Sequence, residues 1–220
     1  SMKTVSRVLN QEPNVSEATR LAVEAAVEKL KYRPHPSARM LAGKRSYLIA
    51  LMHDNPSGNY LMEVVLGVLD TCLSQHYNMM LAPLDYTAAD IAERVEALVL
   101  QSRLDGAVLT PPLTDNEALM DRLDALDIPY SSISPKEEHR RIGVVLDERN
   151  AIREMVVYLA SLGHRRIAHI KGHHEHGASA WRLAGYRDGL KEAGLRFNSA
   201  LVVNGEFSYE SGVVGANHLL

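Results

Sequence analysis

Two groups of side chains in this sequence have types and spacing that could carry chemistry, and the first is a set of basic residues near its start. Residues 1–46 contain nine lysines and arginines and four glutamates, a balance of +5, whereas the other 174 residues carry a balance of −8. Lys3 and Arg7 stand four residues apart, so a helix would place both on one face. Such an asymmetry is typical of a nucleic-acid-binding segment, although a solvated helical face would explain the charge equally well.

The second group is the run His173-His174-Glu175-His176, whose imidazole and carboxylate groups are of the kinds that bind metal ions. Neighbouring histidines in a loop rarely all reach one ion, and no cysteine or second cluster supports these four residues. We therefore expect no metal and no cofactor, and we interpret the run as a solvated loop near a ligand-binding cleft.

Sequence signatures of enzymes are missing. The glycines near Gly163 and Gly172 form neither a phosphate-binding loop nor a dinucleotide fingerprint. Ser57 and Ser179 lack the flanking glycines of a hydrolase nucleophile. We therefore predict that the protein is not an enzyme.

Composition narrows the class of protein further. With 220 residues, 46% hydrophobic and 23% charged, the chain can form one large or two small domains, which excludes fibrous, collagen-like and wholly disordered classes. The single cysteine, Cys72, excludes an intramolecular disulfide and suits a reducing compartment. No run approaches the roughly 18 apolar residues of a membrane span, and no secretory signal opens the chain. We expect a cytoplasmic protein with no membrane partner.

The elements that must position the basic residues are two short helices. Apolar residues at three- and four-residue spacing predict a helix over residues 2–10. Ser16 is placed as the N-cap of a second helix, which must end before Pro34. The inner face of this second helix would consist of Thr19, Val23, Ala26, Val27 and Leu30.

From Ser46 onward, short apolar runs alternate with helical patterns. Strands are predicted at residues 47–52, 78–84, 107–110 and 129–133, joined by helices at 61–75, 88–102 and 115–126. After residues 143–147 the pattern restarts with a helix at 151–162, a strand at 166–171, a helix at 180–193, a strand at 200–203 and a helix from Tyr209. This alternation predicts an α/β fold with doubly wound parallel sheets in two lobes, the second of them incomplete.

Parallel sheets of this type bind ligands beyond the carboxyl ends of their strands, which selects a set of cleft residues. Their polar groups could hydrogen-bond sugar hydroxyls, and an aromatic ring could supply an apolar wall. The polar candidates are Asp54, Asn55, Thr110 and Asp147, and the aromatic candidates are Tyr60 and Trp181. Asp54, Asn55, Tyr60 and Asp147 could equally be turn or capping residues.

A family resemblance unites these observations. The first part of the chain resembles, without gaps, the lactose repressor (LacI/GalR) family of bacterial transcription regulators. The segment that carries this resemblance is TVSRVLNQEPNVSEATRLAVEAAVEKLKYRPHPSARMLAGKRSYLIAL. The resemblance continues through LASLGHRRIAHIKG and RLAGYRDGLKEAGL. It implies a type I periplasmic-binding-protein-like core of two lobes with a small effector between them, preceded by a partial all-α helix-turn-helix head.

The resemblance also implies where the domains meet. It assigns the head to residues 1–33, the hinge helix and linker to 34–46, the first lobe to 47–147 and part of the second lobe to 148–220.

The first predicted helix corresponds to the family's recognition helix, which lies in the major groove of operator DNA. By resemblance Met2, Lys3 and Arg7 face base edges, and the Arg7 guanidinium can bond guanine O6 and N7 in a bidentate way. Short hydroxyl and amide side chains suit phosphate oxygens. The residues that correspond to phosphate contacts are Ser1, Thr4, Ser6, Asn10, Asn14, Ser16, Thr19 and Tyr32.

Residues 36–43 correspond to the family's hinge helix. Pro36 suits a first helical position and Gly43 a C-terminal cap, but so short a helix needs a partner to become ordered. By resemblance the helix pairs with a second copy in the minor groove, where Leu41 is the apolar wedge and Ala38 lets the two helices approach closely. The alternative for Leu41 is burial against the body.

One departure from the family concerns the head. The family's helix-turn-helix begins about fifteen residues upstream of Ser1, so Val5, Val8 and Leu9 are expected to lack the helix against which they pack. We therefore expect the 220-residue chain to bind operator DNA poorly, although the full-length protein would bind it. About a hundred residues of the family's core are also expected to be missing.

The family's cleft arginine corresponds to Arg182, at the start of RLAGY. The alternative for Arg182 is a surface ion pair with a nearby carboxylate.

The leading hypothesis is a repressor that binds a pseudo-palindromic operator as a homodimer and responds to a small effector, with a carbohydrate as the first choice. A solute-binding protein of the same fold is the alternative, but it would have no use for the basic segment.

Overall fold

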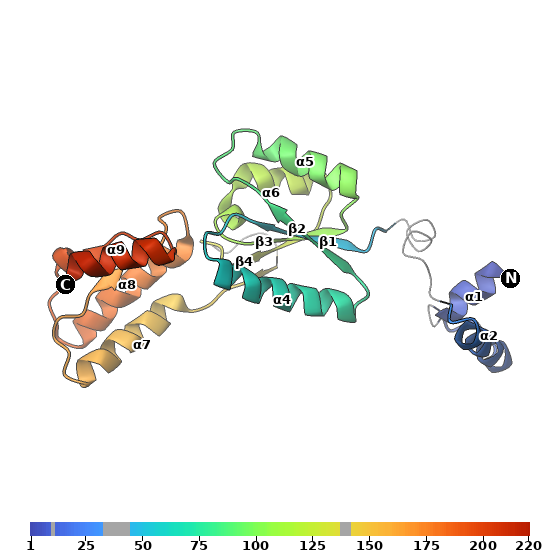
Figure 1. The fold of residues 1–220 in the computed structure, drawn as a ribbon, viewed down its shortest axis with the longest axis horizontal. Helices are drawn as coiled ribbons and strands as arrows, with labels where there is room; N and C mark the ends of the chain where they lie inside the picture. Colours follow the sequence, from blue (N-terminus) through green and yellow to red (C-terminus); the bar gives the residue numbers. More distant parts are fainter. Residues whose placement is uncertain (10–11, 33–44, 137–141) are drawn as a thin grey trace. The chain divides into compact units, whose positions relative to one another are not determined.

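The computed structural model describes residues 1–9, 12–32, 45–136 and 142–220. The chain divides into two compact units, Ser1–Arg45 and Ser46–Leu220 (Figure 1). Three predicted DNA contacts, Asn10, Ala38 and Leu41, lie outside the described residues, as does the predicted hinge helix.

The first unit contains helices α1 (Met2–Leu9) and α2 (Glu17–Lys29), as the apolar spacing predicted. Ser16 caps α2, since its hydroxyl oxygen accepts a hydrogen bond from the Thr19 amide at 3.4 Å. Val8 of α1 is buried, whereas α2 buries none of its side chains fully. The core of this unit is therefore small.

A five-stranded parallel sheet forms the first part of the second unit, in the order β2-β1-β3-β4-β5. Its strands are β1 (Leu48–His53), β2 (Asn78–Pro83), β3 (Gly106–Leu109), β4 (Tyr130–Ile133) and β5 (Gly143–Val144). This order is that of a doubly wound fold, with the reversal next to β1.

Helices cover both faces of this sheet. They are α4 (Gly58–Ser74), α5 (Ile91–Ser102) and α6 (Glu117–Ala125), with a short 3₁₀ helix at Leu113–Asp115. Figure 1 shows α4 on one face and α5 with α6 on the other. Between the sheet and α5 with α6, Val95, Leu109, Leu119 and Leu123 are fully buried and form the centre of the larger core.

The start of β1 is fixed by a side chain from the loop before β3. The Asp105 carboxylate accepts hydrogen bonds from the Ser46 amide (2.9 Å), the Ser46 hydroxyl (3.1 Å) and the Tyr47 amide (3.0 Å). Tyr47 has a φ of +54°, so the strand begins one residue later than predicted.

The second part of this unit contains α7 (Glu148–Ser161), β6 (His169–Ile170), α8 (Gly177–Glu192), β7 (Val202–Val203) and α9 (Tyr209–Leu219), with a 3₁₀ helix at Ser199–Leu201. β6 and β7 pair in parallel, over fewer residues than predicted. Both α7 and α8 begin three residues earlier than predicted, and Asp147 caps α7. A smaller core gathers Val156, Ile167, Tyr186 and Leu190.

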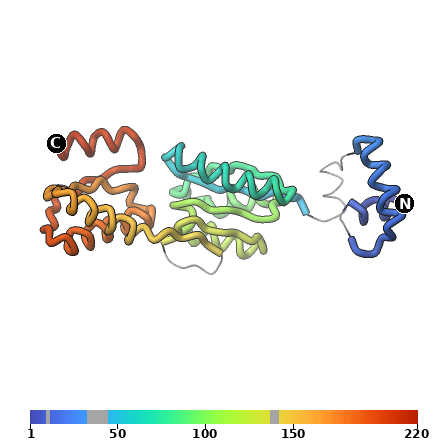
Figure 2. Tube along the Cα trace, turned by 90° about the horizontal axis from the view of Figure 1, so that it is seen from below, coloured from blue at the N-terminus to red at the C-terminus, as the bar shows by residue number. Residues whose placement is uncertain are grey.

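Helices α7 and α8 lie side by side (Figures 1 and 2) because α8 presents glycines to α7. A Cβ atom added to Gly185 would stand 2.1 Å from the Arg149 carbonyl oxygen, and one added to Gly189 would stand 2.7 Å from the Arg153 carbonyl oxygen. The same two arginines pair across the helices, Arg149 with Asp188 and Arg153 with Glu192, each at 2.6 Å. Backbone contact and ion pairs thus hold the two helices in one register.

No helix in the described part of the chain is long and apolar enough to cross a membrane.

Candidate functional site

The first candidate surface is the outer face of α1, where Met2 and Lys3 are exposed. Arg7 is half-buried, and its Nε atom lies 3.5 Å from a Glu12 carboxylate oxygen. Because both side chains remain about half in water, this pair is weak, and a phosphate or a guanine edge can replace Glu12 as the partner.

Four of the predicted phosphate-contacting hydroxyls occur as two pairs. Ser1 and Thr4 share a hydrogen bond of 3.1 Å, and Ser16 and Thr19 share one of 2.8 Å. Each pair stands at the start of a helix, where amide groups and the helix dipole favour an anion. Of the other predicted contacts, Ser6, Asn14 and Tyr32 all lie on the exposed surface of this unit.

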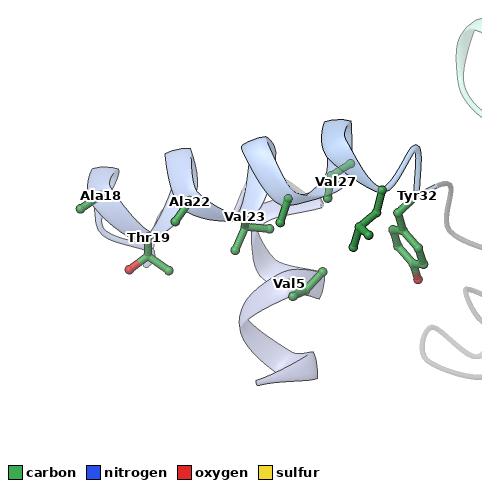
Figure 3. Close-up of a pocket in the computed structure, with 9 residues that line it drawn as sticks. Val5, Ala18, Thr19, Ala22, Val23, Val27 and Tyr32 are labelled. Atoms are coloured by element: carbon green, nitrogen blue, oxygen red, sulfur yellow. The ribbon is translucent and has the colours of Figure 1, made fainter.

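An apolar groove of about 560 Å³ runs along α2 and takes in one residue of α1 (Figure 3). All five residues of the predicted inner face of α2 line it, so these apolar side chains are open rather than packed. The lining residues are Val5, Ala18, Thr19, Ala22, Val23, Ala26, Val27, Leu30 and Tyr32. The expectation that Val5, Val8 and Leu9 lack a packing partner is wrong for Val8, which is buried, whereas Leu9 is partly exposed and Val5 lines the groove.

The second candidate site surrounds Arg182 on α8. Its Nε atom donates a hydrogen bond of 2.5 Å to the carboxylate of Glu148, the first residue of α7. The Glu148 side chain is 9% exposed and that of Arg182 is 40% exposed. The ion pair that was the alternative for Arg182 is therefore present, and its acidic member is buried.

Two aromatic residues lie near this pair. The Arg182 guanidinium carbon lies 5.6 Å from the centre of the Phe207 ring, within the range of a cation–π contact. Tyr60 lies within electrostatic range of both charges. Its pKa is raised chiefly by burial and further by Glu148, while Arg182 acts in the opposite direction.

His176 stands beside the same ring, with centroids 5.1 Å apart. It is 4% exposed, and burial, followed by the neighbouring His173, lowers its pKa to about 4. At neutral pH it is an uncharged imidazole. The interpretation of this run as a solvated loop is thus right for His174, which is exposed, and wrong for His176, which is buried under Phe207.

Loops of the two sheets meet at this site. The rings of Tyr86 and His173 make an edge contact with centroids 5.9 Å apart, and Lys136 lies 3.5 Å from Glu175. The site is therefore built from both halves of the second unit.

Two of the predicted cleft residues organise turns. The Asp54 carboxylate accepts a hydrogen bond from the Tyr86 amide at 2.9 Å, and the Asn55 side-chain oxygen accepts one from the Ser57 amide at 2.9 Å. The turn role that was the alternative for both is present.

Three further predicted residues also differ in placement from the cleft assignment. Asp147 caps α7 by accepting a hydrogen bond from the Asn150 amide at 3.1 Å. Thr110 is completely buried and its hydroxyl donates to the Met52 carbonyl at 3.4 Å, so it does not face a ligand. Trp181 is partly exposed, and the ring that contacts Arg182 is Phe207 instead.

Comparisons with known proteins follow the same division of the chain. Residues 1–35 match the model of bacterial regulatory proteins of the lacI family, and residues 45–220 match that of periplasmic binding proteins and the sugar binding domain of the LacI family. The chain belongs to the LacI family. Its fold, an α/β periplasmic-binding-protein-like domain after a helical segment, is the one the sequence predicted.

Individual relatives of this LacI-family chain are transcription regulators. The regulator CelR of Thermobifida fusca is 33% identical over 226 residues, which cover 99% of this chain and 65% of that protein. The structure of a CelR–cellobiose complex has 31% identity and a TM-score of 0.68, covering 100% of this chain and 66% of the other. A lac repressor dimer bound to operator and the anti-inducer ONPF has 26% identity and a TM-score of 0.72, covering 96% and 64%. The chain spans 65–66% of the length of three curated relatives.

Sequence reasoning missed two residues of this site, Glu148 and Phe207. Phe207 follows the carboxyl end of β7, so the rule that selected the other loops would have found it. Glu148 carried no signal, because only the packing of α7 on α8 brings it to Arg182.

His53, at the carboxyl end of β1, is a further polar group, and it begins the loop that the strand pattern placed beside the cleft. Both of its ring nitrogens are buried and have no hydrogen-bond partner among the described residues. Burial lowers its pKa, and Asp54 partly opposes the shift. Buried polar atoms without partners are uncommon and suit a polar ligand or ordered water.

Within the described ranges, no group of three or more histidine, cysteine, aspartate or glutamate residues is placed to hold a metal ion.

Proposed function

We propose that this chain belongs to a sequence-specific DNA-binding regulator, acting as a repressor, whose operator affinity is controlled by a carbohydrate bound between two lobes. The observation that carries the proposal is the polar, aromatic-walled site around Arg182, in a chain that also has a basic helical head. Such a regulator acts on the chromosome, which places it in the cytoplasm.

The head supports DNA binding. Lys3 is exposed on α1, and Arg7 is held only by a half-exposed glutamate. The related lac repressor is seen bound to operator. We assign base contacts to Met2, Lys3 and Arg7, and phosphate contacts to the serine and threonine pairs that begin each helix.

The site around Arg182 supports a carbohydrate effector. Sugars present hydroxyl groups that exchange hydrogen bonds with charged and polar side chains, and apolar ring faces that pack on aromatic groups. Arg182, Phe207 and Tyr60 supply both kinds of contact. The related CelR is seen in complex with cellobiose.

An exposed apolar stripe on α4 supports a homodimer. Met62, Leu66 and Leu73 are all more than half exposed on this helix, and Leu81 is exposed on the edge strand β2. Contiguous exposed apolar side chains of this kind mark an interaction surface. A second copy meeting the same surface would give the two-fold symmetry that matches a pseudo-palindromic operator.

The effector would act by changing the relative populations of two arrangements of the lobes. A ligand that binds one arrangement of the two lobes more tightly than another favours that arrangement, and this in turn orders or releases the paired hinge helices with Leu41 as wedge. If the effector favours the arrangement in which the two hinge helices can pair on DNA, it strengthens operator binding; if it favours the other arrangement, it weakens operator binding.

Fluorescence anisotropy of the intact protein on labelled fragments from its own upstream region tests this proposal. We expect the protein to bind one DNA sequence specifically, and we expect cellobiose or another neutral sugar to change its affinity for that DNA. In the Arg182→Met variant, sugar should no longer change the DNA affinity. The operator affinity without sugar should stay unchanged in that variant. Sugar binding without any DNA binding would instead support a solute-binding protein, and DNA binding that responds to no sugar would overturn the carbohydrate assignment.

A further inference from the structure

The ion pair in the effector site suggests how the site selects the charge of its ligand. We propose that Glu148 is a positioning and specificity-determining residue: it holds Arg182 through Nε and cancels its charge, so that the site accepts an uncharged hydroxyl-bearing ligand rather than a phosphorylated one. This inference rests on the proposed function of the site in effector binding.

The geometry leaves most of the guanidinium available. Glu148 engages only Nε, and neither terminal amino group of Arg182 has a hydrogen-bond partner among the described residues. An arginine carries five N–H donors in a fixed plane, four of them on these two amino groups. With Nε anchored, the plane of the fork is fixed and its outer donors can meet ligand oxygens.

Glu148 is itself held in place. Its carboxylate lies at the first residue of α7, where the positive end of the helix dipole stabilises a negative charge. Helix α7 cannot slide along α8, because Gly185 and Gly189 bring the two backbones into contact and two ion pairs cross the seam. The carboxylate therefore stays against Arg182 whether or not a ligand is present.

The consequence concerns ligand charge. An unpaired arginine is a strong binder of phosphate because it offers two parallel charge-assisted hydrogen bonds. Beside the buried Glu148 carboxylate, the Arg182 guanidinium keeps its N–H donors, but the net charge of the pair is zero. An anionic ligand is in addition repelled by Glu148. Lys136, a second cation near His176, is likewise paired, with Glu175.

One cation next to the site is not paired in this way. Lys171, which follows β6, has no carboxylate partner among the residues that the structure describes. It supplies a useful control, since any phosphate binding that arises from Lys171 will disappear in Lys171→Met.

The test uses the intact protein, with inorganic phosphate, glucose 6-phosphate, glucose and cellobiose as probes at constant ionic strength. Stabilisation against heat reports binding by mass action, and calorimetric titration gives the affinities. Glu148→Gln keeps an oxygen acceptor for Nε but removes the charge. Glu96→Gln, which removes the carboxylate that pairs with Arg122 between α5 and α6, is the matched control.

We expect Glu148→Gln to gain about tenfold or more in affinity for phosphate, and the double variant with Arg182→Met to lose that gain. Affinity for a neutral sugar should change less than about threefold in Glu148→Gln. It should fall by about tenfold in Glu148→Ala, because Arg182 is then no longer held. Glu96→Gln should leave the binding of all four probes unchanged, because Arg122 lies outside the residues that form the site.

Two results would overturn the inference: wild-type protein that already binds phosphate through Arg182, or a folded Glu148→Gln protein that gains no phosphate affinity. If Glu148→Gln does not fold, the wild-type comparison with Arg182→Met and Lys171→Met still decides the question. If neutral sugars fail to bind while Glu148→Gln gains phosphate binding through Arg182, the role of Glu148 stands and the carbohydrate proposal fails.

Discussion

At the scale of single residues, His176 shows how burial sets the protonation state of a histidine in the proposed effector site. Its ring lies against Phe207 and His173, and its pKa is lowered to about 4, mainly by burial. A histidine of the unfolded chain titrates near 6.5, so between these two values the unfolded state binds the proton and the folded state does not.

Acid should therefore destabilise the protein through this residue. The stability that this group contributes is complete above pH 6.5 and should be lost progressively down to about pH 4, by on the order of 3 kcal/mol. Urea unfolding at pH 7.5, 6, 5 and 4.5 measures the loss. His176→Gln should flatten the dependence, whereas His174→Gln, at an exposed position, should leave it unchanged. An equal slope in both variants would contradict the assignment.

At the scale of elements, the seam between α7 and α8 positions the site, because it sets where Glu148 meets Arg182. Gly185→Ala should separate the helices, since the new methyl group would occupy the space of the Arg149 carbonyl oxygen. We expect a loss of about 3 kcal/mol in the free energy of unfolding, measured by urea denaturation, together with weaker sugar binding.

Gly67→Ala is the matched control, since no atom lies within 4 Å of the added methyl group in α4. It should be neutral or slightly stabilising, because alanine is the better helix former. If Gly185→Ala is as stable as Gly67→Ala, the close contact of the two helices does not set their packing.

Elements were also what the sequence predicted best. The apolar period and the caps located α1, α2, α4, α5 and α6 to within a few residues, because helical spacing of apolar residues and capping side chains are local signals that do not depend on distant parts of the chain. The strands β6 and β7 came out shorter, since strand length depends on pairing partners that no local pattern records.

The site was less predictable than the elements. Arg182 was identified by resemblance and Tyr60 by its place near the end of a strand, but Glu148 depends on a contact between two helices. Asp54, Asn55 and Asp147 were selected as ligand-binding candidates but organise turns and a helix cap, because aspartate and asparagine side chains occur in turns and caps as often as in binding sites.

At the scale of the whole molecule, the exposed stripe on α4 predicts how copies of the chain associate. Leu66→Glu would place a charge on a surface that we expect to be buried between two copies, at a position that is 53% exposed in the single chain. Sedimentation should show the intact protein as a dimer and the variant as a monomer with weakened operator binding. Leu100→Glu, on α5 at a position 62% exposed, should remain a dimer.

The carboxylate of Asp105 holds the first residues of the second unit in a fixed position on the sheet. Three hydrogen bonds tie Ser46 and Tyr47 to the loop that leads into β3. Tension on the chain at residue 45 is therefore shared between two adjacent strands, β1 and β3, instead of being carried by the first strand alone. Conversely, any displacement of the loop before β3 is passed directly to Ser46 and Tyr47, the first residues of the second unit.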